Sequence, residues 1–572
     1  MFRMAVAILT NASVTPRGRL TRGIHKLISR SPIRPGGIAR LLALAALLVG
    51  AAVEAARPRP NIVLCFADDL GRHGSVYADP ERPSANDVVH TPNLDRIARE
   101  GVLFDCALVS APSCTPSRAS LLSGRHFFRN GSHSQLHHPW APGFDDPWDN
   151  VRGFPLTLAD NGYHIGWTYK LHVYADRMGG ADRNYQSAGR RFNSYSQVVS
   201  KSVDPLEAKG ELLDEVRQNF TSFLADRDED QPYFYWFNPT NTHRPWTRGS
   251  GKRLWGIDPD SLAGKLPAFL PDNETVREDF ADYLGEAQAF DAAVGVLIKE
   301  LAQRGELDNT IFIVSGDHGA PGFPRGKCNV YDFGSQAPLA IRWPGRLAAG
   351  NRIEAPVSLI DLAPTLLDAV GINAVEAMDG ESLLPVIRAD EPEDEATLRG
   401  WAIIGRENHV RDARPAGLPY PIRAIRTRDW LYIHNFAPDR WPVAEPPLAA
   451  PLVKGMRRQG GRWVRPTDMD GSPTFTWFIG NENAADIADA WRLGFARRPT
   501  EELYAVTEDP DQMHNLADDP AHRETLEALR DQLFDELRRG EDPRVVGEGE
   551  AFDEPPYAPD DPDLGRVAKP TT

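Results

Sequence analysis

The segment Pro60-Asn-Ile-Val-Leu-Cys-Phe-Ala-Asp-Asp-Leu-Gly71 decides the fold class of this 572-residue chain. Its unbroken apolar run predicts a strand that is buried on both faces, as in a parallel sheet. The run ends at Asp68 and Asp69, and we expect these carboxylates to be functional because ligands bind beyond the carboxyl ends of parallel strands. The segment 310–315 repeats the pattern, with an apolar run followed by Gly-Asp-His-Gly.

Strands and helices alternate along the first 400 residues. We expect further strands at 102–109, 163–168, 233–238 and 339–343, and helices at 91–101, 154–162, 206–227, 276–304 and 358–370. Thr91 should cap the first of these helices, with Pro92 in its first turn and Gly101 at its end. The alternation predicts an α/β fold in which helices sandwich a large mixed, mostly parallel sheet.

The pattern changes near residue 401. Residues 422–434 predict a hairpin with a turn at 427–429, and residues 522–539 predict an amphipathic helix. A smaller α+β domain is therefore expected after the large one, followed by an acidic, proline-rich tail that is either loose or ordered by contact. The expected parts are a leader (1–56), a larger domain (57–400), the smaller domain (401–540) and the tail (541–572).

The leader has the three parts of a secretory signal peptide. Eight basic residues and no acid precede Glu54, residues 41–53 carry no charge, and small residues surround Glu54. Thirteen apolar residues are too few to span a bilayer comfortably, so we expect an exported protein, periplasmic or extracellular, without a stable membrane span. An uncleaved anchor and a wrongly assigned start codon are the alternatives.

The formal net charge is −16, and removal of residues 1–56 would bring it to −23. Such an acidic chain argues against nucleic acid as a partner and is, on charge alone, a poor host for anionic substrates. The four cysteines are too few for a disulfide framework. Cys65, inside the first apolar run, is expected to be a buried core thiol.

Two pairs of possible metal ligands end two of the strands: Asp68 with Asp69, and Asp317 with His318. Taken alone, either pair could cap a helix or fix a turn. Three carboxylates in one crevice would repel one another unless a cation lay between them, so together the pairs predict a divalent metal. Oxygen ligands favour Ca²⁺ or Mg²⁺, whereas the nitrogen of His318 moves the preference towards Mn²⁺ or Zn²⁺.

Between these pairs lies Cys114-Thr-Pro-Ser-Arg118, followed by Leu122 and Gly124. Composition alone would make it a free thiol at a helix N-terminus. The pattern resembles the signature of type I sulfatases of the alkaline-phosphatase superfamily, and the resemblance extends over about 58–538. It implies an alkaline-phosphatase-like fold and a maturation enzyme that oxidises Cys114 to formylglycine. It also implies one divalent cation, most simply Ca²⁺, with Cys114 among its ligands.

The resemblance also assigns roles to other residues. It implies that Arg118 and Lys170 hold the sulfate oxygens together with the metal. It implies that His172 is the base, and that His243 and Lys327 neutralise or protonate the leaving group. The hydrate of formylglycine would supply the nucleophile that attacks sulfur. For either histidine alone, a structural role would be the simpler interpretation.

Several segments are similar to those of heparan N-sulfatases (sulfamidases) and their bacterial relatives. They include the run 130–138, the residues after Lys327 and the segment 405–409. The chain departs from the best-known sulfamidases at His318, where they have Asn, and at Lys327, where they have Arg, which leaves substrate and metal open. The candidate sugar-binding residues in these segments are His133, His137, His138, Glu407 and His409.

We therefore expect an exported sulfatase that hydrolyses O- or N-sulfate on a sulfated saccharide. A phosphonate monoester or phosphodiester hydrolase of the same superfamily is the first alternative, since those relatives also use formylglycine. A non-catalytic carbohydrate-binding relative is the second, although a binding protein has no need of Cys114 or the metal residues. The sequence leaves the sugar, exo or endo action and the oligomeric state open.

Overall fold

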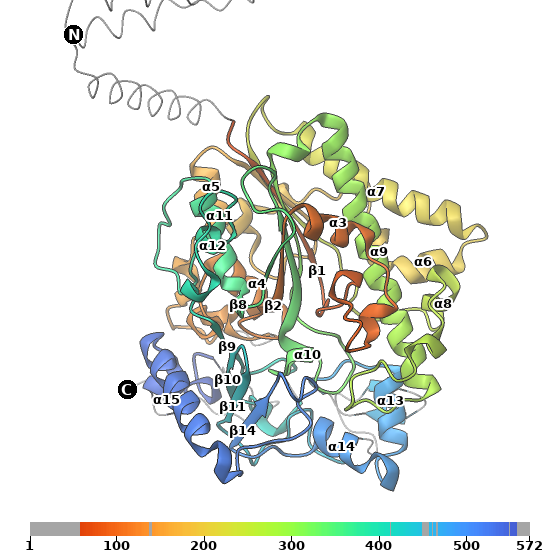
Figure 1. Ribbon diagram of the computed structural model, residues 1–572, viewed down its shortest axis with the longest axis vertical. Coiled ribbons are helices and arrows are strands. Elements are labelled where there is room, and N and C mark those ends of the chain that lie inside the picture. The colour runs from red at the N-terminus through yellow and green to blue at the C-terminus, as the bar shows by residue number, and fades with distance from the viewer. Residues whose placement is uncertain are drawn as a thin grey trace, which may run out of the picture. The chain divides into compact units, whose positions relative to one another are not determined.

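Strand β1 (Asn61–Ala67) is an inner strand of an eight-stranded sheet in the computed structural model of the chain (Figure 1). The predicted leader with its apolar run, and His137 and His138, lie outside the described residues. From Arg59 onward the described chain forms one compact unit. The structure describes residues 58–136, 140–411, 413–448, 457–459, 462–464, 467–547 and 549–557.

The sheet has the strand order β3-β4-β1-β5-β6-β2-β7, with β8 also pairing β2. Its other strands are β2 (Val102–Leu108), β3 (His164–Tyr169), β4 (Tyr233–Asn238), β5 (Thr310–Gly316), β6 (Gln336–Arg342), β7 (Asn351–Ile353) and β8 (Val357–Ser358). The strands β3, β4, β1 and β5 run parallel, whereas β6 is antiparallel to both β5 and β2. This mixed, mostly parallel sheet confirms the predicted fold class. β6 begins at Gln336, earlier than predicted, because Gln336 pairs with Leu108 beyond a bulge in β2.

Side chains of β1 alternate between the two faces of the sheet, and each face carries a hydrophobic core. Val63 and Cys65 pack on one face, with Cys65 fully buried as predicted, and Ile62 and Leu64 pack on the other. The first face is covered by α3 (Pro92–Glu100), α6 (Tyr195–Lys201), α7 (Pro205–Ala225), α8 (Ser250–Trp255) and α9 (Glu274–Arg304) (Figure 1). The second is covered by α4 (Cys114–Ser123), α5 (Gly153–Asp160), α11 (Leu362–Ala369) and α12 (Leu384–Ile387).

The two ends of α3 are determined partly by local sequence and partly by tertiary contacts. The helix starts at Pro92 and Thr91 is its N-cap residue, both as predicted, but the Thr91 side chain makes no capping hydrogen bond and instead accepts one from the backbone N–H of Ser75. The helix ends at Gly101, also as predicted. A side chain at Gly101 would clash with β6, since an added Cβ would lie 2.1 Å from the carbonyl oxygen of Ile341.

A second sheet is antiparallel and has the order β14-β11-β10-β9. Its strands are β9 (Trp401–Arg406), β10 (Ile422–Thr427), β11 (Trp430–Asn435) and β14 (Glu501–Ala505). One face packs against α15 (Arg523–Arg539) through Ile403 and Leu533, and the other packs against β2 through Ile404 and Leu108. The sheet and α15 confirm the predicted α+β part. The remaining elements of this region are α10 (Asp332–Ser335), β12 (Arg457–Gln459), β13 (Arg462–Val464), α13 (Pro473–Gly480), α14 (Ala488–Phe495) and α16 (Pro543–Val546).

The first part of the predicted tail is ordered by ion pairs with the second sheet. Asp542 contacts Arg423 of β10 at 2.6 Å, and Arg544 contacts Glu407 at 2.6 Å. Arg423 also contacts Glu407 at 2.8 Å, and the side chains of both are fully buried. Of the two alternatives for the tail, order by contact therefore holds for its described residues, which reach Tyr557.

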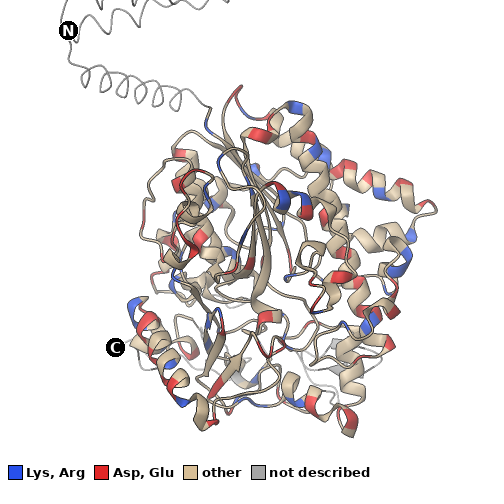
Figure 2. Cartoon of the chain, in the orientation of Figure 1, with Lys and Arg blue, Asp and Glu red and all other residues tan. Residues whose placement is uncertain are grey.

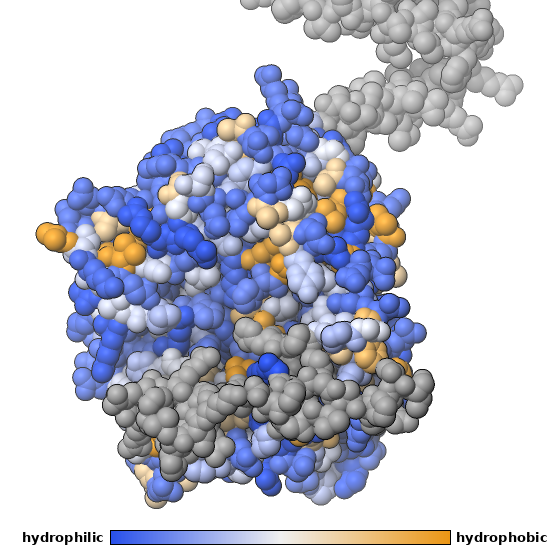
Figure 3. Space-filling view, turned by 180° about the vertical axis from the view of Figure 1, so that it is seen from behind, coloured by the Kyte–Doolittle hydropathy of each residue, from blue (hydrophilic) through white to orange (hydrophobic). Residues whose placement is uncertain are grey.

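Charged side chains lie mainly on the helices and loops, and the strands of the large sheet carry few of them (Figure 2). The face seen in Figure 3 is mostly hydrophilic, with apolar residues in small scattered patches. Within the described part of the chain, none of the helices combines the length and the apolarity needed to cross a membrane.

The pair between Arg423 and Asp542 should be a measurable part of the stability. Asp542→Asn keeps the hydrogen-bond acceptor that caps α16 but removes the charge, which leaves Arg423 buried with one acidic partner fewer. We expect the free energy of unfolding in urea to fall by about 3 kcal/mol, as for other broken buried pairs. Asp535→Asn removes an exposed pair with Arg538 and should change it by less than about 0.5 kcal/mol. Equal effects of the two substitutions would show that the tail, through Asp542, contributes nothing to the free energy of unfolding.

Candidate active site

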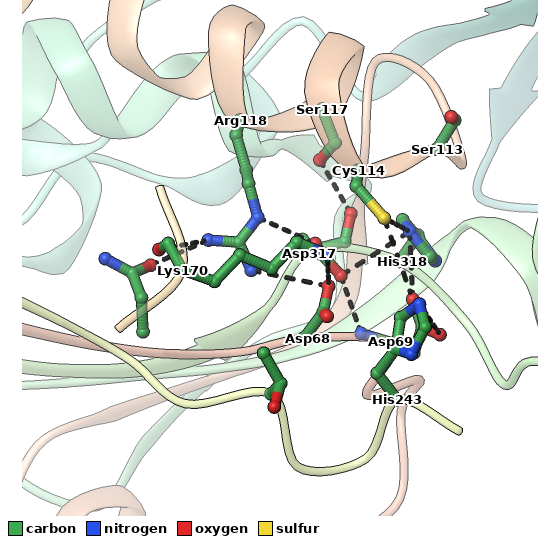
Figure 4. Close-up of polar contacts among 12 residues, drawn as sticks. Asp68, Asp69, Ser113, Cys114, Ser117, Arg118, Lys170, His243, Asp317 and His318 are labelled. Atoms are coloured by element: carbon green, nitrogen blue, oxygen red, sulfur yellow. Dashed lines mark hydrogen bonds and ion pairs between the residues drawn. The ribbon is translucent and has the colours of Figure 1, made fainter. Parts of the chain in front are cut away.

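Three chain segments bring polar side chains together at the carboxyl ends of β1 and β5 (Figure 4). Asp68 and Asp69 follow β1, Asp317 and His318 follow β5, and Cys114 is the first residue of α4. The backbone N–H of Asp69 donates to Asp317 Oδ1 over 2.7 Å, which joins the two strand ends directly. Cys114 Sγ lies 3.4 Å from His318 Nε2 and 3.9 Å from Asp69 Oδ1. All five predicted metal-site residues therefore meet in one cluster.

Helix α4 presents Cys114 to this cluster. Ser113 is extended, the helix starts at Cys114, and it ends at Gly124 in the left-handed conformation, with φ 67°. The hydroxyl of Ser117 donates to the carbonyl oxygen of Asp317 over 2.6 Å and so fixes the first turn of α4 to the end of β5. The free N–H groups at the start of a helix favour negative charge, here on Cys114.

Arg118, one turn further along α4, is fully buried. Its Nε donates to Asp317 Oδ2 over 2.9 Å, and one terminal nitrogen donates to Asn238 Oδ1 over 2.8 Å. The other terminal nitrogen lies 3.6 Å from Asp68 Oδ1. Since the planar guanidinium is held on three sides, the fold fixes its position before any ligand binds.

Two lysines flank the carboxylates. Lys170 Nζ donates to Asp68 Oδ1, and Lys327 Nζ donates to Asp69 Oδ2 over 3.0 Å. Burial would raise the pKa of the Asp68 carboxyl, but Lys170, His243 and Arg118 hold it well below its usual range. These cations therefore favour the ionised form of Asp68, whereas burial raises the pKa of Asp69 above its usual value in spite of Lys327.

The same surroundings set the protonation of Cys114 and His318. Burial would raise the pKa of the Cys114 thiol, but Lys170 and Lys327 lower it to about 6. Burial would lower the pKa of His318, but the neighbouring carboxylates raise it to about 9. These surroundings therefore favour the thiolate form of Cys114.

The two predicted catalytic histidines differ in their preferred charge. His243 Nε2 lies 3.9 Å from Asp69 Oδ2, and although burial opposes protonation, Asp69 raises the pKa of His243 above its usual value. Desolvation and the positive charge of Lys170 lower the pKa of His172, although its side chain is exposed. At neutral pH, His172 is therefore neutral, whereas His243 is biased towards the protonated form.

The donor atoms of the cluster fit a divalent cation. Three groups of possible ligand atoms occur among the described residues, and the atoms of each group lie within 4.8 Å of one another. One comes from Asp69, Cys114 and His318, the second from Asp68, Cys114 and Asp317, and the third from Asp68, Asp69 and His243. Asp68 Oδ2 is buried and has no hydrogen-bond partner among the described residues. Buried oxygens normally have a partner, so this oxygen is free to ligate a cation.

The predicted sugar-binding residues are placed differently. His409 Nδ1 lies 2.8 Å from the hydroxyl of Ser113, the residue before α4. Glu407 is buried in its ion pairs with the second sheet and the tail, and His133 is buried in a stack on Trp148 with ring centroids 4.0 Å apart. Sugar binding by His133, Glu407 and His409 stays a prediction, as does that by the two histidines outside the described residues.

Sequence reasoning missed Asn238 and Asp470. Asn238 ends β4 and accepts the hydrogen bond from Arg118, and its place at the end of the strand next to β1 was a usable signal. Asp470 precedes α13, and its carboxylate lies 3.2 Å from Lys327 Nζ. No local pattern marks Asp470, because it reaches the site from a loop far along the chain.

Comparison with known proteins agrees with this geometry. A family model described as Sulfatase matches residues 60–372. The chain is 29% identical to the human N-sulphoglucosamine sulphohydrolase over 528 residues, which cover 86% of this chain and 92% of that protein. It is 24% identical to an ulvan-active sulfatase of Formosa agariphila, over 83% of this chain and 74% of that protein.

Solved structures share the fold. One is a protein in complex with its substrate D-glucosamine-2-N,6-O-disulfate, with a TM-score of 0.56 and 18% identity over 86% of this chain and 100% of that chain. Another is the phosphonate monoester hydrolase of Agrobacterium radiobacter, with a TM-score of 0.54 and 19% identity over 84% and 96%. These two likenesses show a shared fold only. The family match covers more than half of the residues of the chain and therefore shows the family as well. The chain therefore belongs to the sulfatase family and is a hydrolase of sulfuric esters or sulfamates.

Proposed function

We propose that the protein is an exported, formylglycine- and calcium-dependent sulfatase that removes sulfate from a sulfated saccharide, with N-sulfated glucosamine as its leading substrate. The observation that carries the proposal is the set of fixed cations around Cys114, namely Arg118, Lys170 and Lys327, in a chain of net charge −16. Such a local concentration of positive charge suits a sulfate group. The likeness to N-sulphoglucosamine sulphohydrolase supports the N-sulfate, and the signal-like leader supports export.

The residues of the site have different roles on the two sides of a bound sulfate group. Arg118 and Lys170, on the side of Asp68, hold the sulfate oxygens. The neutral imidazole of His172 accepts a proton there, since its low pKa leaves a ring nitrogen free at neutral pH. On the side of Asp69, Lys327 and protonated His243 donate to the departing oxygen or nitrogen of the sugar.

Two further groups complete the site. Formylglycine, made from Cys114 by a maturation enzyme, would supply a hydrated aldehyde as the nucleophile. The five metal-site residues Asp68, Asp69, Cys114, Asp317 and His318 would hold a divalent cation, which would supply charge that polarises the reacting oxygens. Three carboxylate ligands favour Ca²⁺ for this role, with Mn²⁺ and Mg²⁺ as alternatives.

Removing the nucleophile should abolish the reaction. We expect Cys114→Ala to release no sulfate, because the methyl group of alanine carries neither the thiol nor an aldehyde made from it. In matured wild-type protein, mass spectrometry of the peptide that contains residue 114 should show the thiol exchanged for an aldehyde. Cys106→Ala alters another buried cysteine, outside the cluster, and should retain sulfate release. Full activity with an unmodified Cys114 would contradict the assignment.

The substrate class can be tested with the matured protein and three substrates. Glucosamine N-sulfate, glucosamine 6-O-sulfate and a phenyl phosphonate ester separate the candidate activities. We expect the largest kcat/KM for the N-sulfate, by at least about 10-fold, equivalent to roughly 1.4 kcal/mol of transition-state binding. Hydrolysis of the phosphonate without release of sulfate would favour the phosphonate hydrolase. Binding of saccharide without turnover would favour the non-catalytic relative.

The metal should be removable and should stabilise the fold. We expect Asp69→Asn to lower the calcium content measured by mass spectrometry of the metal from one ion per chain, and to lower kcat/KM by at least about 100-fold. Added Ca²⁺ should raise the melting temperature of chelator-treated wild type but not that of Asp69→Asn. Asp489→Asn, at an exposed carboxylate of α14, is the matched control and should bind calcium normally. Unchanged calcium content in Asp69→Asn would contradict the assigned ligands.

A further inference from the structure

Asp470 adds a fourth carboxylate to the active site. It lies just before α13, and one of its oxygens is 3.2 Å from Lys327 Nζ. The groups of possible metal ligands found among the described residues do not include Asp470. Its side chain is 30% exposed, so it is reachable from solvent, unlike the fully buried Asp69 on the other side of Lys327.

The loop that carries Asp470 is fastened on both sides. Asp468 accepts a hydrogen bond from the backbone N–H of Val410 over 2.8 Å, and the hydroxyl of Ser472 donates to the carbonyl oxygen of Gly322 over 2.6 Å. Gly322 has φ 75°, and a Cβ added to it would lie 3.1 Å from the backbone oxygen of Asp470. The close approach of these two loops fixes the carboxylate beside Lys327 as part of the fold.

The position of Asp470 relative to the cations defines its side of the site. Arg118 and Lys170 contact Asp68, whereas Lys327 lies between Asp69 and Asp470. Unlike Asp68 and Asp69, Asp470 belongs to no group of possible metal ligands, so no cation would shield a sulfate group from it, and Asp470 faces the part of the substrate that is not sulfate. Lys327 and His243 are proposed to donate to the leaving group, so that part of the substrate is the sugar that leaves.

Asp470 also has the capacity to bind such a sugar. Burial would raise its pKa, but Lys327, His243 and His409 hold the pKa of Asp470 well below its usual range, so the group stays ionised. Asp470 Oδ2 is buried against Lys327, so the exposed part of the side chain is the part that a sugar could meet. An ionised carboxylate only accepts hydrogen bonds, and its natural partners on a sugar are hydroxyl and ammonium groups.

We infer that Asp470 is a specificity-determining residue that accepts hydrogen bonds from a hydroxyl or ammonium group of the sugar beside the scissile sulfate. It thereby disfavours substrates that carry a second sulfate or a carboxylate at that place. The inference rests on the proposed saccharide sulfatase activity. It adds to that activity a preference for substrates whose sugar carries a hydrogen-bond donor next to the scissile sulfate.

The test compares matured full-length wild type, Asp470→Asn and Asp470→Ser on two substrates. One is the sulfated glucosamine that the wild type cleaves best, and the other is an aryl sulfate with no hydrogen-bond donor beside the sulfate. We expect kcat/KM for the saccharide to fall by about 10- to 100-fold, as when hydrogen bonds to a charged group are lost, and that for the aryl sulfate by less than about 3-fold. Asp486→Asn, at an exposed carboxylate, should leave both values unchanged.

The outcomes separate this inference from the proposed function. An equal fall on both substrates would mean that Asp470 only positions Lys327, and an unchanged saccharide rate would mean that it does not contact the sugar. Either result overturns the inference and leaves the sulfatase activity standing. Wild type that cleaves the aryl sulfate but no saccharide would overturn the proposed substrate class itself. Equal melting temperatures of the variants would show that the losses do not come from misfolding.

Discussion

The structure depends on holding three carboxylates together in a buried place. Asp68, Asp69 and Asp317 are fully inaccessible, and charges are tolerated in such surroundings only when opposite charges lie close to them. Arg118 and Lys327 supply part of that compensation from α4 and from the loop after β5. A cation and a sulfate group would therefore enter a framework whose dipoles and charges already have their places, which is the condition for electrostatic catalysis without reorganisation.

The topology explains how segments from distant parts of the chain reach this place. β1 and β5 are adjacent and parallel, so the residues that follow them lie side by side. β4 is the parallel neighbour of β1 on the other side and brings Asn238 to Arg118. Helix α4 adds Cys114 at its N-terminus, and Ser117 ties that helix to the end of β5. The active site is thus the edge of the sheet at which its parallel strands end.

Features that depend on local sequence could be predicted, whereas features that depend on contacts between distant parts of the chain could not. Strongly apolar strands and the carboxylates behind them could be read locally, because burial on both faces leaves a continuous apolar run. Thr91 is the N-cap residue, but its hydroxyl bonds Ser75 rather than the helix backbone, and Glu407 is buried in an ion pair with Arg544 of the tail. Asp470 could not have been found, since only packing between distant loops brings it to Lys327. Local sequence encodes the large sheet, while the leaving-group side of the site depends on long-range contacts.

An acidic chain is compatible with an anionic substrate because the acids on the surface and the cations of the site act over different distances. The acids lie largely on the outer helices and loops (Figure 2), while Lys170 and Lys327 lie against the buried carboxylates of the site. Salt screens charges over about 8 Å at physiological ionic strength, so the surface does not cancel the local attraction. It does repel a long polyanion, which would have to lie along the surface. The arrangement favours the end of a short sulfated saccharide, with Asp470 selecting for an uncharged or cationic neighbour of the sulfate.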